Sequence, residues 1–216
     1  MSEVLFNGPE GKLQGYYKHY EDSRIVSLIL HPRECEVNSM ENNIVSVLFD
    51  CFQENSFSTL KFNFRGVNKS EGDPDQEGLG EISDAATALD WLQKHNPDAN
   101  ICLIGGVSFG SWVGSQLLMR RPEIVGFVNV AIPTNDFDFS FLSPCPASGL
   151  IFHPEKELTI DKKKITGLVR NLSKKNNIKI TYKLIDSDIN FKNKESQMKK
   201  EIVKFVSNTI ANLEKS

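Results

Sequence analysis

The sequence contains little cysteine, little histidine and no long apolar run. No stretch approaches the roughly 18 apolar residues of a membrane-spanning helix, and residues 1–9 lack the charged and then apolar profile of a secretory signal. The four cysteines form no CxxC pair, so we expect free thiols in a reducing compartment rather than a disulfide scaffold. These absences predict a cytoplasmic protein with no membrane partner.

Metal-binding patterns are also missing. His31 and Cys35 lie four residues apart, but no second ligand pair accompanies them. A protein metal site needs several suitable ligands at compatible spacing. We therefore expect neither a metal nor another cofactor.

Charge is distributed unevenly along the 216 residues, although the net charge is only −3. Residues 1–150 carry 10 basic and 20 acidic side chains, a net of −10, whereas residues 151–216 carry 15 and 8, a net of +7. A basic C-terminal segment can indicate a nucleic-acid surface. The length and ordinary composition, with 39% hydrophobic and 25% charged residues, predict one globular domain over residues 1–216.

The periodicity of the closing segment favours a packed helix over a nucleic-acid surface. Met198, Ile202 and Val206 recur at helical spacing, and Lys200 and Lys204 fall on the opposite side. No aromatic or arginine cluster accompanies these lysines. We therefore expect a solvated lysine face and no nucleic-acid partner, while the oligomeric state is left open.

Apolar runs and helical periodicity alternate along the chain. Two short strands around residues 4–6 and 13–17 flank an Asn-Gly-Pro turn, which predicts an antiparallel hairpin. Strands are predicted at 25–30, 59–64, 101–104, 124–131, 148–152 and 178–185, and helices at 44–52, 82–92, 112–119, 161–174 and 198–213. This alternation predicts an α/β fold with a mostly parallel central sheet, the N-terminal hairpin and helices on both faces. No insert is long enough for a lid domain.

One motif points to chemistry. Gly106, Ser108 and Gly110 form G-x-S-x-G directly after a predicted strand and at the start of a predicted helix. This is the setting of a nucleophile elbow, in which a strained turn presents the serine and the glycines avoid steric overlap. The backbone N–H of Phe109, at the helix N-terminus, is then a candidate donor to an oxyanion.

Further segments extend this pattern along nearly the whole chain: His31-Pro32, Phe62 to Val67 followed by Ser70-Glu71-Gly72, Ala88 to Leu92, Arg120 to Glu123 and Phe137 to Leu142. With the elbow, the sequence resembles the α/β-hydrolase superfamily, and more closely its small lidless bacterial hydrolases of the dienelactone-hydrolase and serine-peptidase-like type. The resemblance implies the α/β-hydrolase fold and a serine esterase-like site.

The resemblance also indicates a second oxyanion element in the loop after His31-Pro32. Pro32 has no N–H, so Arg33 is the expected oxyanion-binding donor. The family tends to have a glycine-containing loop here, whereas Arg33 to Glu36 is bulky and charged.

The remaining members of a catalytic triad match the family only in part. In this fold the acid and the histidine follow the nucleophile along the chain. Glu157 stands at the acid position, but Asn190 stands where the histidine is expected. Asparagine cannot accept and return a proton near neutral pH, and loss of a triad member costs on the order of 10⁴- to 10⁶-fold in rate. The sequence therefore predicts an inactive or much weakened hydrolase that retains Ser108 and binds a small acyl or carbonyl ligand.

Two alternatives remain open. The only histidines are His19, His31, His95 and His153, and none follows the last predicted strand. His31 and His153 come at carboxyl ends of strands, so an active hydrolase with one of them as an unconventional base, or with water held by Glu157, is the first alternative. An interaction or nucleic-acid-binding protein that reuses the fold is the second. The substrate is not specified by the sequence.

Overall fold

The computed structural model describes residues 1–33, 39–156, 162–173 and 178–213. Its strands are β1 (Ser2–Gly8), β2 (Gly11–Lys18), β3 (Ile25–Leu30), β4 (Ser58–Phe62), β5 (Ile101–Val107), β6 (Ile124–Val130), β7 (Ser148–Pro154) and β8 (Ile180–Ile185). Its helices are α1 (Asn43–Glu54), α2 (Leu79–Lys94), α3 (Phe109–Leu118), α4 (Lys162–Leu172) and α5 (Glu195–Leu213), with a short 3₁₀ turn η1 (Ser140–Leu142). Each predicted strand and helix corresponds to one of these elements, and the bounds differ by a few residues.

The strands form one eight-stranded sheet in the order β1-β2-β4-β3-β5-β6-β7-β8. The β1–β2 and β2–β4 pairs are antiparallel and every other pair is parallel. The prediction of a mostly parallel sheet with an N-terminal antiparallel hairpin is therefore confirmed. Because parallel strands end at one edge, the loops after β3, β5, β6, β7 and β8 meet there.

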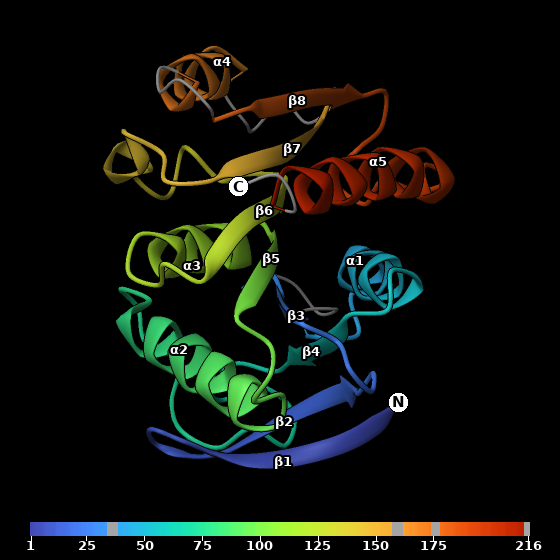
Figure 1. Ribbon diagram of the computed structural model, residues 1–216. Coiled ribbons are helices and arrows are strands. Elements are labelled where there is room, and N and C mark those ends of the chain that lie inside the picture. Colours follow the sequence, from blue (N-terminus) through green and yellow to red (C-terminus); the bar gives the residue numbers. More distant parts are fainter. Residues whose placement is uncertain (34–38, 157–161, 174–177, 214–216) are drawn as a thin grey trace.

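Helices cover both faces of the sheet, as Figure 1 shows. Helices α1 and α5 lie on one face and α2 and α3 on the other, while α4 lies near the β8 end. Two groups of buried apolar side chains fill the layers. Strand β3 illustrates why: Val26 to Leu30 are fully buried, as expected of a continuous apolar run in a strand covered on both faces.

The closing helix α5 packs through its apolar side. Met198, Ile202 and Val206 are buried, whereas Lys200 and Lys204 are exposed. The predicted amphipathic helix is confirmed. Among the described helices, none has the length and apolar character to cross a membrane.

Candidate functional site

Ser108 occupies a sharp turn between β5 and α3. Its backbone has φ 48° and ψ −118°, a region that non-glycine residues rarely adopt and that stores strain. Hydrogen bonds hold the turn on both sides: the Ser108 N–H donates to the Val130 carbonyl at 2.8 Å, and the Ser111 N–H donates to the Ser108 carbonyl at 2.9 Å. The turn is therefore strained and held on both sides, with a partly exposed serine at its tip, as the predicted nucleophile elbow requires.

The two glycines of the motif are required by close backbone contacts. A Cβ at Gly106 would lie 2.5 Å from both the Gly110 carbonyl oxygen and the Ser111 Cα. A Cβ at Gly110 would overlap the Leu30 carbonyl oxygen and lie 2.7 Å from that of His31. The steric reason predicted for the glycines is therefore visible in the structure: β5, α3 and the end of β3 approach too closely for side chains.

Phe109 is the first residue of α3, so its N–H belongs to the positive end of a helix whose first N–H groups lack intrahelical partners. Its side chain is buried, and its ring lies 5.7 Å from Phe64, 5.9 Å from Trp112 and 5.4 Å from Phe137, measured between centroids. These contacts fix the backbone beside Ser108. The position suits the oxyanion donor that the sequence predicts.

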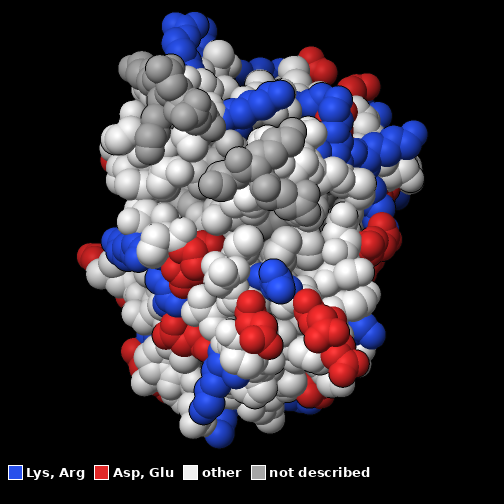
Figure 2. All heavy atoms as spheres, viewed as in Figure 1, with Lys and Arg blue, Asp and Glu red and all other residues white. Residues whose placement is uncertain are grey.

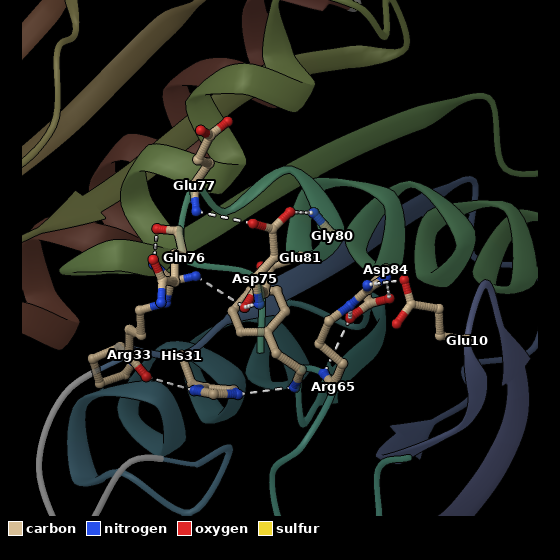
Figure 3. Close-up of polar contacts among 12 residues, drawn as sticks. Glu10, His31, Arg33, Arg65, Asp75, Gln76, Glu77, Gly80, Glu81 and Asp84 are labelled. Atoms are coloured by element: carbon tan, nitrogen blue, oxygen red, sulfur yellow. Dashed lines mark hydrogen bonds and ion pairs between the residues drawn. The ribbon is translucent and has the colours of Figure 1, made fainter. Parts of the chain in front are cut away.

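Arg33 uses its side chain to anchor the loop after β3. The guanidinium lies 4.3 Å from the centre of the Phe109 ring. It also donates through Nη1 to the Gln76 carbonyl and through Nη2 to Glu81 Oε1, both at 3.0 Å (Figure 3). The bulky residue thus ties the loop to α2 and to the first residue of α3. The neighbouring Glu34 to Glu36 lie outside the described residues.

Glu81, which the sequence analysis did not single out, is a buried carboxylate of α2. Its Oε1 accepts from Arg33 and, at 3.2 Å, from the Asp75 N–H. Burial raises the pKa of Glu81, opposed by the positive charge of Arg33. The carboxylate therefore joins the loop after β3 to the loop that precedes α2.

A second ion pair in the same region was also not predicted from the sequence. Arg65 donates to Asp84 through Nε at 3.0 Å and Nη2 at 2.8 Å, and its backbone N–H donates to the same carboxylate at 3.0 Å. Its Nη1 donates to Glu10 at 2.6 Å (Figure 3). The hydrogen bonds to Asp84 raise the pKa of Arg65. This pair holds the loop after β4 against α2. The only local indication in the sequence is that Glu81 and Asp84 are three residues apart, which places both carboxylates on one face of the helix.

Both ring nitrogens of His31 form hydrogen bonds with backbone groups. The imidazole is buried, with Nε2 at 3.0 Å from the Phe64 N–H and Nδ1 at 2.6 Å from the Pro32 carbonyl (Figure 3). The carbonyl only accepts, so Nδ1 carries the proton, and Nε2 uses its lone pair on Phe64. Burial lowers the pKa of His31 to about 4. This geometry does not support His31 as the base of Ser108.

The other histidines are placed differently. His153 is buried in β7, opposite Leu184 of β8, and its ring centre lies 6.2 Å from that of Tyr182. His19 and His95 are exposed, as expected. Among the residues that the structure describes, no hydrogen bond joins the Ser108 hydroxyl to a histidine.

The predicted acid and the residue at the histidine position belong to the loops after β7 and β8. Glu157 lies outside the described residues. Asn190 is exposed, and its N–H donates to Asp188 Oδ1 at 3.0 Å. Lys156 and Asp186 form an ion pair at 2.8 Å, which brings the two loops together at the edge that carries Ser108.

Comparison with known proteins places this fold in a family. The uncharacterized protein RP471 of Rickettsia prowazekii is 40% identical over 208 residues, which cover 94% of this chain and 87% of the relative. The crystal structure of ATU1826 from Agrobacterium tumefaciens, a protein of unknown function named as a candidate α/β hydrolase, is 41% identical with a TM-score of 0.92, over 98% of this chain and 97% of the other. No protein-family model matches the chain. The chain belongs to the α/β-hydrolase superfamily.

Within that superfamily the chain is similar to small members without a lid. XC6422 from Xanthomonas campestris, a serine hydrolase without lid, is 23% identical with a TM-score of 0.84, covering 96% of this chain and 94% of the other. A serine hydrolase homologue from Coxiella burnetii is also 23% identical, with a TM-score of 0.83, over 94% and 96%. At this level of identity the likeness concerns the fold. The resemblance predicted from the sequence is confirmed.

Proposed function

We propose that the protein is a serine-hydrolase homologue that binds small acyl or carbonyl compounds at Ser108 and hydrolyses esters only weakly. The observation that carries this proposal is the strained elbow at Ser108, which has no histidine hydrogen-bonded to its hydroxyl within the described part of the chain. Phe109 and Arg33 are the proposed oxyanion donors through their backbone N–H groups, and Glu157 is the proposed acid. A serine hydroxyl without a base is a poor nucleophile at neutral pH.

The chemistry follows from what each group can do. The N–H of Phe109 at the start of α3 favours negative charge, so a carbonyl oxygen that gains charge on attack would be stabilised there. In the described part of the chain, no histidine is placed to remove the serine proton and later return it to the leaving group. The protein therefore still binds an ester but cleaves it slowly.

The test is hydrolysis of p-nitrophenyl butyrate by the wild type, Ser108→Ala and Asn190→His. We expect the wild-type rate to lie within about tenfold of Ser108→Ala, because the Ser108 pathway lacks its base. Asn190→His would supply that base and raise the rate by roughly 100-fold or more. Asn193→His is the matched control, since it places the same side chain in the same loop, and it should leave the rate unchanged.

The same assay separates this proposal from the alternative of an unconventional base. Fast wild-type turnover that disappears in Ser108→Ala would contradict a weakened enzyme. If that turnover also disappears in His153→Gln, then His153 is the base instead. An equal rise from Asn190→His and Asn193→His would show that Asn190 does not stand at the histidine position.

A further inference from the structure

A groove lies between the loop after β6 and helix α4. Its volume is about 560 Å³, within the range of pockets that hold small molecules. Residues 134–140 form one wall, and Lys163, Lys164, Gly167, Leu168 and Asn171 form the other. In Figure 1 the segment between β6 and β7 lies on the same side of the sheet as α3 and α4.

The groove adjoins the candidate site through aromatic contacts. The Phe137 ring, which lines the groove, lies 5.4 Å from the Phe109 ring and 4.8 Å from that of Trp112, measured between centroids. Because β6 is the neighbour of β5, the loop after β6 begins at the edge where Ser108 is held by the Val130 carbonyl. A ligand whose carbonyl lies at Ser108 therefore has this groove as an adjacent space for its remaining part.

The wall formed by residues 134–140 is fixed before any ligand arrives. The indole N–H of Trp112 donates to the Asp138 carbonyl at 3.2 Å, and the Ser140 N–H donates to Asp138 Oδ1 at 2.8 Å. Across the groove, Lys164 Nζ donates to Asn135 Oδ1 at 3.0 Å. A preformed groove binds with a smaller loss of conformational entropy than a mobile one.

Gly167 keeps the opposite wall open. It lies in the middle of α4, where glycine is less favourable than alanine, and it has an ordinary helical φ. A Cβ at this position would meet no atom of the described residues within 4 Å, so packing against them does not explain the glycine. Gly167 lines the groove, so a large side chain at this position would enter it, whereas a methyl group has room.

Among the described residues of the lining, the charges of Asp136 and Asp138 are balanced by those of Lys163 and Lys164. Phe137 and Leu168 add apolar surface. We propose that this groove binds the uncharged aryl or alkyl portion of a carbonyl compound whose carbonyl group lies at Ser108. This inference rests on the proposed function and names the ligand class of the same site.

The test is calorimetric binding of an unreactive aryl ketone, 4-phenyl-2-butanone, to the wild type, Gly167→Ala and Gly167→Trp. We expect Gly167→Trp to bind at least tenfold more weakly, because the indole occupies the groove, and Gly167→Ala to bind as the wild type does. The ionic analogue 4-oxopentanoate should bind at least tenfold more weakly than the aryl ketone.

A second measurement covers the case in which Gly167→Trp does not fold. In amide NMR spectra of the wild type, the ketone should shift resonances of residues 134–140 and 163–171. Equal binding by Gly167→Trp, absence of binding by the wild type, or shifts confined to other regions would overturn the proposal. Failure of the proposed function would show separately, in the ester assay with Ser108→Ala and Asn190→His.

Discussion

The imidazole of His31 links the end of β3 to the start of the loop after β4 by accepting from Phe64 and donating to Pro32. Because its pKa falls from the ordinary 6.5 to about 4 in the folded protein, the unfolded chain binds the proton more tightly. Stability from this group is therefore full above about pH 6.5 and is lost as the pH falls toward 4. A pKa of about 4 in place of 6.5 corresponds to about 3 kcal/mol in the free energy of unfolding at neutral pH.

We expect urea titrations at about pH 7 and about pH 4.5 to show that the wild type loses more stability in acid than His31→Gln does, by about 2 kcal/mol in the free energy of unfolding. The comparison between the two proteins removes the contribution of the carboxylates, which both share. Equal acid losses would mean that His31 does not titrate as its buried, doubly hydrogen-bonded setting requires.

Replacing Gly110 and Gly167 by alanine should change the stability of the protein in opposite directions. Gly110 has backbone atoms of Leu30 and His31 where a Cβ would lie, whereas Gly167 has open space. We expect Gly110→Ala to lower the free energy of unfolding by about 1–3 kcal/mol or more, as overpacking does, and to displace Ser108. Gly167→Ala should raise it by about 0.5–1 kcal/mol. Chemical denaturation of both variants checks this, and equal effects of the same sign would contradict the contact geometry.

At the scale of elements, the loop after β4 and helix α2 are joined by the buried pair of Arg65 and Asp84, whose side chains are 4% and 1% exposed. Asp84→Asn leaves the guanidinium buried without its full partner. We expect a loss of about 3–5 kcal/mol in the free energy of unfolding, measured by urea titration. Glu3→Gln, which removes the exposed pair with Lys69, is the control and should leave the midpoint nearly unchanged.

These pairs also show why some features of the fold and site could be predicted from the sequence and others could not. The strand at Ile25–Leu30 and the elbow at Ser108 are local patterns, in which an apolar run or five adjacent residues carry the information. Arg65 and Asp84 are 19 positions apart, and Arg33 and Glu81 are 48 apart. Nothing local joins such partners, because they meet only after β3, β4 and α2 have packed. The bonding of His31 depended in the same way on the Phe64 backbone, 33 positions away.

At the scale of the whole molecule, the uneven charge of the sequence becomes a spatial division. On the face shown in Figure 2, Lys and Arg side chains gather at the end that holds β8, α4 and α5. Two lysines of β8 and α5 are paired: Lys183 with Glu201 and Lys199 with Glu54, both at 3.0 Å. Lysines on an edge strand such as β8 also discourage pairing with another chain. Solvation and edge protection therefore account for this basic end.

A nucleic-acid surface on the same end would behave differently in salt. Neutralising many phosphates releases counterions, so the affinity of a protein with six to ten phosphate contacts falls by about 10³- to 10⁵-fold between about 50 mM and 200 mM salt. Because several lysines here already face carboxylates, we expect a short DNA duplex to show no saturable binding by fluorescence anisotropy at either salt concentration. Tight binding with that steep salt dependence, lost when Lys179 and Lys183 are changed to Gln, would instead make the β8 end a nucleic-acid surface. The division of charge would then have a functional rather than a solvating role.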